Sequence, residues 1–329
     1  MIFLPEPLHK IAVVGVGCCG RNAINYIQQD LENDVDLWVF DTDSRGMESD
    51  EYVKRIAIGQ EITQGLSAGS IPEQGQAAAQ QSLELINQSL SGYDIIFVTG
   101  GLGGGTATGV IPVLTEFLKH LDVIVVTIVT TPFGFEGRKK TEYANQAISL
   151  INASSDSTIS VSNQKLLTTM PKSSTLLSAF EASNQVLKNS LLGIYSLIST
   201  TGYINLDFAD VRTVLSNAGP TVIGYGQGTG EHRVVQAVDS ALNNPLINDF
   251  DLACSTALLI NITADYSLTL EEIHQAGELL TNKTQNDIPI IIGTVVHDTI
   301  QDDVKIYAIF SGVETKPFLE LVHDVGEQA

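Results

Sequence analysis

Two glycine-rich segments carry the clearest chemical signal, because glycine leaves backbone N–H groups open to an anionic ligand. The first, GVGCCG at residues 15–20, matches the pattern G-x-G-x-x-G between a strand-like and a helix-like run. Asp41 and Asp43 follow roughly 20 residues later, as in a dinucleotide-binding fingerprint. Alone, this segment leaves three interpretations open: an NAD site, another nucleotide site, or a tight strand-to-helix turn without a ligand.

The second segment, GGLGGGTATG at residues 100–109, changes that balance. It follows the apolar run IIFVT, and we expect a helix to begin near Thr108 with its dipole directed at the same place. A flexible linker is disfavoured, because the segment lies between two apolar stretches. Two such loops suit a triphosphate held from both sides, whereas a dehydrogenase needs one. Neither loop continues as G-x-x-x-x-G-K-[ST], so a P-loop enzyme is excluded.

The elements that must position these loops follow an alternating pattern. Short apolar runs rich in β-branched residues alternate with helix-like segments, which predicts a parallel, doubly wound sheet. Strands are expected at 10–17, 36–43, 93–100 and 122–131, and helices at 21–31 and 71–90. Pro72 and Glu73 mark the start of the second helix.

A change of pattern in the second half predicts a second domain. Residues 173–200 form one apolar-periodic stretch without proline, typical of a helix of about 40 Å that links two domains. Beyond it, helices and strands predict a smaller α/β unit, in which Thr269 and Glu272 form a capping box. The predicted organisation is a nucleotide-binding domain at 1–172, the linking helix at 173–200, a second domain at 201–315 and a short tail at 316–329.

Composition and charge narrow the class of partner and compartment. A net charge of −21 in 329 residues argues against nucleic acid or bare membrane as main partners. Three cysteines, two of them adjacent, indicate a reducing compartment. The start MIFLPEPLHK lacks the apolar core of a signal peptide, and no apolar run is long enough to insert into a membrane. We therefore expect a cytoplasmic protein. The six histidines are scattered, so no metal ligands are assigned.

The segment GGGTATG at 103–109 resembles the glycine-rich signature of the FtsZ/tubulin family of polymerising GTPases. Further segments follow in the family order. GVGCCGRNA, DTDS and GLSAGSIPEQG resemble its phosphate loops, TPFGFEGRKK its ribose segment, and VSNQKLL and AFEASNQVL its guanine segments. NLDFADVRTV resembles the loop that completes the neighbouring subunit's active site, and NITADYSLTLEE resembles the C-terminal domain. The resemblance, from about residue 10 to 313, implies a Rossmann-like GTP-binding domain, a long central helix and a smaller α/β C-terminal domain.

The resemblance also implies roles for individual residues. The phosphate contacts are expected from Gly17, Gly20 and Asn22 on the α- and β-phosphates, from Ala68 and Gly69 on the γ-phosphate, and from Gly104, Gly105, Thr106 and Gly109 around the β- and γ-phosphates. Cys18, Asp43, Gly103, Ala107, Thr108 and Lys140 complete the nucleotide-binding set. Glu136 is expected on the ribose, Phe180 against the base, and Asn163 and Asn184 at the guanine edge. Asn205, Asp207 and Asp210 are expected to act catalytically on the next subunit's nucleotide.

Several positions depart from the family pattern. Cys18, Cys19 and Ala107 replace glycines, which adds bulk near the phosphates. Asp41 and Ile71 stand where asparagine is usual, and Lys140 stands where the family carries an arginine. These departures bear on hydrolysis rate and nucleotide affinity more than on the fold. For Asp207 and Asp210, capping of the following helix is the competing interpretation.

The resulting hypothesis is a GTPase that polymerises head to tail, in the manner of bacterial cell division filaments. GTP or GDP with Mg²⁺ is the implied cofactor, and K⁺ is a further candidate ion. The main partner is a second copy of the chain. Membrane adaptors or division proteins are candidate partners, although no adaptor-binding peptide is evident in the tail. Two alternatives stay open: a divergent paralogue that assembles but hydrolyses GTP poorly, and, more remotely, an NAD-dependent oxidoreductase.

Overall fold

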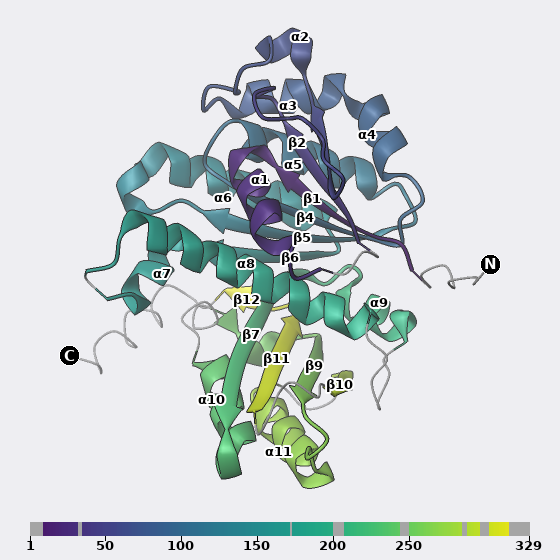
Figure 1. The fold of residues 1–329 in the computed structure, drawn as a ribbon, viewed down its shortest axis with the longest axis vertical. Coiled ribbons are helices and arrows are strands. Elements are labelled where there is room, and N and C mark those ends of the chain that lie inside the picture. Colours follow the sequence, from purple (N-terminus) through teal and green to yellow (C-terminus); the bar gives the residue numbers. More distant parts are fainter. Residues whose placement is uncertain are drawn as a thin grey trace. The chain divides into compact units, whose positions relative to one another are not determined.

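The computed structural model describes residues 9–31, 35–171, 173–199, 207–243, 250–284, 288–296 and 303–315 (Figure 1). The chain divides into two units, Met1–Lys188 and Asn189–Ala329, and the division falls within one long helix, α8 (Leu176–Ser199). The catalytic candidate Asn205 and the expected tail at 316–329 lie outside the described residues.

Six parallel strands form the sheet of the first unit, in the order β3-β2-β1-β4-β5-β6. They are β1 (Ile11–Val16), β2 (Val35–Asp41), β3 (Val53–Ala57), β4 (Ile95–Gly101), β5 (Ile124–Thr131) and β6 (Ser157–Ser162). Strand β1 is buried throughout, as its unbroken apolar run predicts, and Val16 lies level with Phe40 of β2 and Gly100 of β4. The strand order reverses between β1 and β4, so a crevice for ligands is expected at their carboxyl ends.

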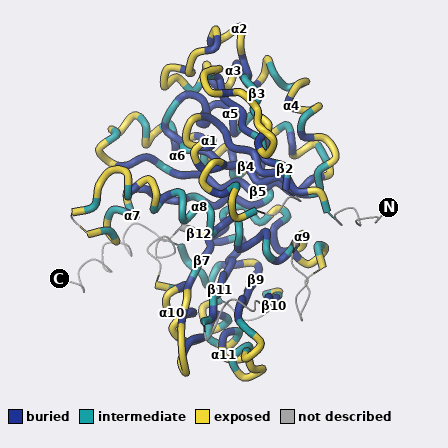
Figure 2. The backbone as a smooth tube through the Cα atoms, viewed as in Figure 1, coloured by how far each residue is buried: buried dark blue, intermediate teal, exposed yellow. Residues whose placement is uncertain are grey.

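Helices cover both faces of this sheet. The helices of the first unit are α1 (Gly17–Ile27), α2 (Gln60–Thr63), α3 (Pro72–Gln81), α4 (Leu83–Leu90), α5 (Thr106–Leu118), α6 (Arg138–Ser154), α7 (Asn163–Thr169) and the first part of α8. Ala12, Val14 and Val16 pack in one core with residues of α3, α4, α5 and α6. On the opposite face, a Cβ at Gly15 would meet Ile24 of α1 at 2.6 Å, so α1 covers that side. Figure 2 shows the strands as the buried centre of this unit and the loop around α2 as its exposed edge.

The predicted parallel α/β architecture is confirmed, and several elements differ from the prediction in detail. The helix expected over 71–90 is two helices, because the backbone breaks at Ser82, whose hydroxyl accepts a hydrogen bond from the Gly59 N–H at 2.9 Å. The helix expected from about Thr108 begins at Thr106. Strands β3 and β6 were not predicted, because β3 is an edge strand carrying Lys54 and Arg55 and β6 is rich in Ser and Thr.

The second unit is built on a four-stranded mixed sheet in the order β10-β9-β11-β7. Its strands are β7 (Gly219–Thr229), β9 (Ala257–Ala264), β10 (Ile290–Val296) and β11 (Asp303–Ser311), and a separate pair joins β8 (Phe250–Asp251) to β12 (Glu314–Thr315). β9 and β10 run parallel, and β11 is antiparallel to β9 and β7. The helices are α9 (Phe208–Leu215), α10 (Arg233–Leu242) and α11 (Leu270–Thr281).

Two local features stabilise the helices of the second unit. The predicted capping box at α11 is confirmed: Thr269 accepts from the Glu272 N–H at 3.2 Å, and Glu272 accepts from the Thr269 N–H at 2.9 Å. Buried Arg233 at the start of α10 makes two hydrogen bonds to Glu272, at 2.6 and 3.0 Å. These bonds raise the pKa of Arg233 and lower that of Glu272. One ion pair therefore joins α10 to the capped end of α11.

In the part of the chain that the structure describes, no helix is long and apolar enough to cross a membrane.

Candidate functional site

A cavity of about 370 Å³ opens at the carboxyl ends of β1, β2 and β4. It is lined by Val16, Gly17, Cys18, Cys19, Arg21, Asp41, Asp43, Arg45, Ser67, Ser70, Gly101, Gly104, Gly105, Thr106 and Ala107. These residues come from four separate segments: the start of α1, the loop after β2, the loop before α3, and the junction of β4 with α5. Both glycine-rich segments predicted from the sequence therefore meet at one cavity.

Two helix starts converge on this cavity without side-chain caps. Helix α1 begins at Gly17 and α5 at Thr106, and neither has a side-chain hydrogen bond to its first turn or an acidic residue there. The first N–H groups of a helix lack intrahelical partners, and the helix dipole adds positive potential at that end. Two such ends at one cavity, with glycines between them, make a site for an anionic group such as phosphate.

The glycines of the first loop have different tasks. Gly17 has a φ of +70°, and its missing side chain lets α1 approach Thr106, whose Cβ would lie 3.3 Å from an added Cβ. Gly20 is buried against β1, where an added Cβ would lie 2.6 Å from the Gly15 carbonyl carbon. The structure thus gives Gly20 a packing role, while Cys18 and Cys19 line the cavity. Asn22 is exposed on α1 and does not line the cavity.

The second loop contains one open glycine among packed ones. A Cβ added to Gly104 would meet nothing within 4 Å, whereas one added to Gly105 would lie 2.8 Å from the Ile71 nitrogen. Gly109 packs against the Pro72 carbonyl, which brings α5 close to α3. Thr108 is buried, and its hydroxyl accepts a hydrogen bond from the Gly103 N–H at 2.9 Å, which closes the loop. Gly103 and Thr108 therefore shape the loop without lining the cavity.

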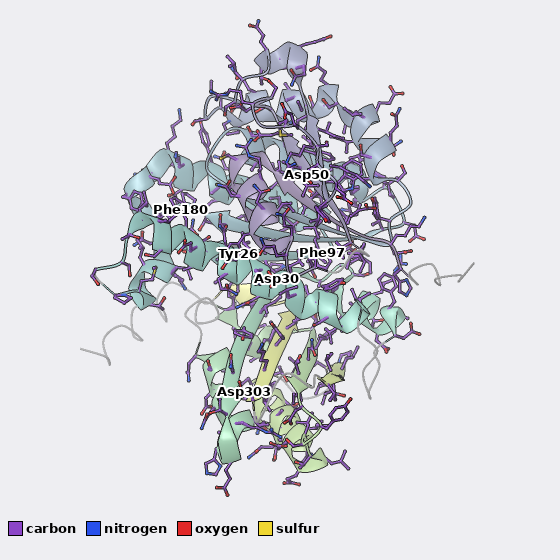
Figure 3. All side chains as sticks on the ribbon, in the orientation of Figure 1. Tyr26, Asp30, Asp50, Phe97, Phe180 and Asp303 are labelled. Atoms are coloured by element: carbon purple, nitrogen blue, oxygen red, sulfur yellow. The ribbon has the colours of Figure 1, made fainter. Side chains whose placement is uncertain are left out.

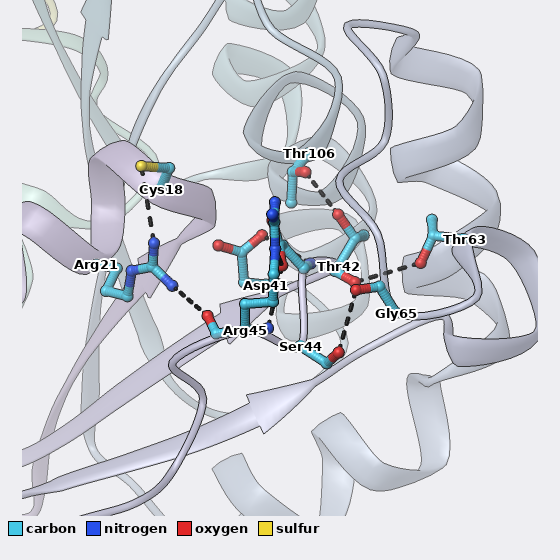
Figure 4. Close-up of polar contacts among 10 residues, drawn as sticks. Cys18, Arg21, Asp41, Thr42, Ser44, Arg45, Thr63, Gly65 and Thr106 are labelled. Atoms are coloured by element: carbon cyan, nitrogen blue, oxygen red, sulfur yellow. Dashed lines mark hydrogen bonds and ion pairs between the residues drawn. The ribbon is translucent and has the colours of Figure 1, made fainter.

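The loop after β2 is fixed by a polar network (Figure 4). The hydroxyls of Thr42 and Thr106 lie 2.8 Å apart and are buried, so this bond joins the end of β2 to the start of α5. Arg45 makes two side-chain hydrogen bonds to Asp43, at 2.9 and 2.6 Å, which lower the pKa of Asp43 to about 2. Arg21 donates to the Arg45 carbonyl at 3.0 Å and lies 3.9 Å from the Cys18 sulfur.

The third loop presents an unusual backbone beside the cavity. Gly69 has a φ of +61° and open space where a side chain would be, and Ser70 adopts the same left-handed φ of +61° despite its side chain. Ala68 is fully buried, and its carbonyl accepts from the Ile71 N–H at 3.0 Å. Ser67 and Ser70 line the cavity on either side of Ala68 and Gly69.

A second cluster gathers the residues predicted for ribose and base. Glu136 accepts from the Phe133 N–H at 3.0 Å and pairs with Lys140 at 2.9 Å. Phe133 lies edge-on to Phe180 with ring centroids 5.6 Å apart, and Phe180, labelled in Figure 3, is 41% exposed. The partly exposed ring of Phe180 thus belongs to the same cluster as the Glu136 carboxylate.

The two predicted amide readers lie on neighbouring elements of this cluster. Asn163 is buried at the start of α7, and its Oδ1 accepts from the Ser183 hydroxyl of α8 at 2.8 Å. Asn184, the next residue of α8, is half-buried.

Polar contacts tie the first part of α8 to α1, the helix that carries the first glycine loop. Tyr26 of α1 donates to Gln185 at 2.8 Å, and Asp30 pairs with Lys188 at 2.7 Å. Tyr26 and Asp30 are both labelled in Figure 3. These contacts fix the aromatic cluster relative to the helix that opens on the cavity.

Asp207 and Asp210 occupy the N-terminus of α9 in the second unit. The Asp207 carboxylate accepts from the Ala209 N–H at 3.4 Å, and the Asp210 carboxylate accepts from the Asp207 N–H at 3.2 Å. This is a reciprocal capping box, so the structure supports the capping interpretation for both residues. Both residues are also exposed, and the cap holds their side chains in place at the surface. Capping and a role at a neighbouring subunit are therefore compatible.

Several cavity residues were not predicted from the sequence. They include the two arginines of the lining, Arg21 and Arg45, together with Ser67, Ser70 and Gly101. Arg21 lies within the segment GVGCCGRNA and Arg45 directly follows DTDS, so their positions in or beside the loops were a usable signal. Among the described residues, no group of three or more His, Cys, Asp or Glu is placed to hold a metal ion.

Comparison with known proteins agrees with this geometry. Residues 10–171 match the model of the tubulin/FtsZ family GTPase domain, and residues 219–314 match that of the FtsZ family C-terminal domain. The chain is 36% identical over 314 residues to the cell division protein FtsZ of Wigglesworthia glossinidia brevipalpis, covering 95% of this chain and 82% of that protein.

Solved structures give the same fold. An empty FtsZ dimer from M. jannaschii matches with a TM-score of 0.86 and 33% identity, covering 94% of this chain and 90% of that one. A GTPγS-bound protofilament of CetZ2 from Haloferax volcanii matches with a TM-score of 0.77, covering 97% and 98% of the two chains. At 18% identity, the second match bears on the fold alone.

Proposed function

The chain belongs to the tubulin/FtsZ family, and from this premise we propose that it binds GTP in the cavity at β1, β2 and β4, hydrolyses it, and assembles head to tail into filaments of the cell division kind. The observation that carries the proposal is the convergence of two uncapped helix N-termini, α1 and α5, on one glycine-walled cavity. Backbone N–H groups can hold phosphates even in a chain of net charge −21. Two candidates of other classes, a P-loop enzyme and a dinucleotide oxidoreductase, lack support from the family match.

In this proposal the phosphate groups lie between Gly17 and the Gly104–Thr106 turn. The open side of Gly104 and the packed side of Gly105 suit a ligand that touches the loop from one direction. Gly69, also open, would face the terminal phosphate from the third loop. Gly20, Gly103, Thr108 and Gly109 then act mainly by shaping the loops, and Asn22 is proposed as a contact of the α- and β-phosphates.

The aromatic cluster is proposed as the nucleoside side of the site. The exposed face of Phe180 would pack on guanine, and Glu136, held by Lys140, would accept hydrogen bonds from the ribose hydroxyls. Asn163 has its Oδ1 engaged by Ser183, so its amide N–H groups are the part available to the base. Asn184, the residue after Ser183 in α8, would supply the second amide to the base.

Mg²⁺ would be held mainly by the nucleotide's own phosphates and water, which is its usual mode of binding at phosphate sites. When bound, Mg²⁺ would neutralise phosphate charge. K⁺ is a further candidate whose effect on turnover can be measured directly.

Asp207 and Asp210, with Asn205 before them, are proposed to act on the nucleotide of the next subunit. They belong to the second unit, whereas the cavity belongs to the first. The capping box fixes two exposed carboxylates at one helix end, which suits them to position an attacking water. Each subunit would then hold half of two active sites, so hydrolysis requires assembly. The proposed organisation is a GTP-binding domain at 1–172, a linking helix at 173–200 and an activation domain at 201–315.

A second candidate is a family member that assembles but hydrolyses GTP slowly. The thiols of Cys18 and Cys19 and the methyl of Ala107 line the cavity where only backbone would otherwise stand, and this observation favours it. Added bulk beside a phosphate shifts a reacting group, and small misplacements cost large factors in rate.

The experiment that tests the main proposal starts with the ligand. Chromatography of the nucleotide released on denaturation should give GTP or GDP, and an adenine dinucleotide would contradict it. Asp207→Asn and Asp210→Asn retain an oxygen for the α9 cap, so they should bind GTP and assemble while turnover falls by roughly 10²-fold. Loss of GTP binding in either variant would refute the shared-site mechanism. If the two variants turned over GTP at the wild-type rate while the wild-type protein assembled slowly, neither candidate would be favoured. A different catalytic group would then be required.

The proposed partner is a second copy of the chain, and the proposed location is the cytoplasm. Negative-stain images with GTP and with GDP would test self-assembly. Adaptor or division proteins are proposed as further partners, to be sought by pull-down with filaments rather than monomers.

A further inference from the structure

A buried carboxylate lies in the wall of the phosphate cavity. Asp41, at the end of β2, is 3% exposed and lines the cavity, and Figure 4 shows its side chain among those of the polar network around it. Its Oδ1 accepts a long bond of 3.3 Å from the Asp43 N–H, and its Oδ2 is buried without a hydrogen-bond partner. A buried carboxylate oxygen without a partner is costly, so such an atom at a cavity wall points to a ligand.

The cations of the cavity are committed elsewhere. Arg45 binds Asp43 through two hydrogen bonds, and Arg21 bonds to the Arg45 carbonyl and contacts the Cys18 sulfur. No ion pair to Asp41 is present among the described residues. Burial raises the pKa of Asp41, and only the Arg21 charge and two backbone N–H groups oppose that effect. The carboxyl is thus shifted toward its neutral form before any ligand enters.

The occupant inferred for this cavity is itself an anion. Without Mg²⁺, an ionised Asp41 would face phosphate charge inside a partly desolvated site, and like charges there disfavour each other strongly. A protonated carboxyl offers the opposite interaction, because its O–H donates a hydrogen bond and its other oxygen still accepts one. The unpartnered Oδ2 is the atom from which that proton could be donated to a phosphate oxygen.

Resting on the proposed nucleotide function of the same cavity, we propose that Asp41 binds the Mg²⁺-free nucleotide in its protonated form, so that binding of Mg²⁺-free nucleotide takes up a proton. Asp41 is therefore an affinity-determining residue that makes the site weaker as pH rises. With the carboxyl neutral, the wall donates to phosphate. With it ionised, the same wall repels phosphate.

No other titratable group that lines the cavity accounts for the uptake of a proton on nucleotide binding between pH 5.5 and 8.5. On the loop of Asp41, Asp43 has a pKa of about 2 and Arg45 is its partner. On α1, burial raises the pKa of Cys19 to about 11, and Arg21 donates to the Arg45 carbonyl. Cys18 is the one remaining titratable group of the lining, and a Cys18→Ser variant removes it. No titratable residue of the third loop or of the Gly100–Thr106 segment lines the cavity.

Asp41→Asn is the matched variant, since the amide has nearly the same shape and a permanent donor. The dissociation constant of GDP is measured by calorimetry in EDTA from pH 5.5 to 8.5 for both proteins. A terminal phosphate titrates near pH 6 itself, so the quantity compared is the ratio of wild-type to variant constants, in which that titration cancels. The ratio should rise with pH, by up to about tenfold per pH unit where Asp41 is ionised in the free protein. Whatever Cys18→Ser does to the affinity itself, the rise of the dissociation constant with pH should persist in that variant.

A second measurement needs no variant. The infrared difference spectrum of the wild-type protein with and without GDP should show a protonated-carboxyl band that appears on binding, and Asp43→Asn should retain that band. A ratio that is flat with pH, or one that falls, would overturn the proposal, as would the absence of the band. If neither wild type nor Asp41→Asn bound GDP at any pH, the nucleotide function itself would be refuted instead.

Discussion

Replacing Gly104 with alanine separates ligand binding from folding. An added Cβ meets no atom within 4 Å, and Gly104 does not adopt a positive φ, so the free protein accommodates the methyl group. At such a position Gly→Ala stabilises a fold by about 0.4–1 kcal/mol through the unfolded chain. The melting temperature should therefore hold or rise slightly. The methyl group, however, enters the cavity of about 370 Å³ in which the phosphates are proposed to lie.

With nucleotide bound, the same methyl group overpacks a filled site. Overpacking costs about 1–3 kcal/mol, which corresponds to roughly a 5- to 150-fold weaker affinity for GDP. Gly277→Ala in α11 of the second unit is the control, because it adds the same group 3.3 Å from Ile292 and should leave affinity unchanged. Gly105→Ala should lower stability as well, since its Cβ would lie 2.8 Å from the Ile71 nitrogen. Calorimetric titration and thermal melts measure both quantities. A folded Gly104→Ala protein with wild-type affinity would show that phosphate does not contact this loop.

One labelling experiment and two substitutions test other parts of the structure. Bound nucleotide should protect Cys18 from maleimide. Cys19, whose pKa is raised to about 11, should form thiolate and react only as the pH approaches that value. Peptide mass spectrometry measures the labelling of both cysteines, and rapid Cys19 labelling at pH 8 would contradict the prediction. Asn163→Ala should reduce the preference for GTP over ATP in competition assays, by about 1–3 kcal/mol of lost discrimination; an unchanged ratio would remove Asn163 from the base site. Thr269→Ala should lower stability by about 1 kcal/mol in denaturant titrations by removing the cap on the Glu272 N–H, with GDP affinity unchanged.

Local chemistry made much of this fold predictable. Unbroken apolar runs gave β1, β4 and β5, and the spacing of Thr269 and Glu272 gave the start of α11, because each signal lies within a few residues. Strand β3 escaped prediction because it is an edge strand that carries charged residues, with Lys54 exposed and Arg55 paired to Asp50. The break at Ser82 depends on a bond to Gly59, a residue of a distant loop that no local pattern reveals.

The site was predictable at the level of loops and less so at the level of atoms. The glycine-rich segments identified the cavity, but glycine content does not distinguish Gly20, which packs on Gly15, from Gly104, which faces open space. Nor does the sequence show that Thr42 bonds to Thr106, or that Asp41 is buried with an unpartnered oxygen while Asp43 pairs with Arg45. Such distinctions depend on which segments the fold brings together. The motif therefore indicates the ligand class, and the packing assigns the individual tasks.

The central claim is that each active site is shared: one subunit binds the nucleotide, and the next subunit contributes Asp207 and Asp210. GTP turnover per subunit, measured against protein concentration across the assembly threshold, tests it most directly. Turnover should be negligible for dilute monomers, rise once filaments form, and fall when Asp210→Asn subunits are mixed with wild type at constant total concentration. If dilute monomers hydrolyse GTP at the full rate, the active site is complete within one chain and the claim is wrong.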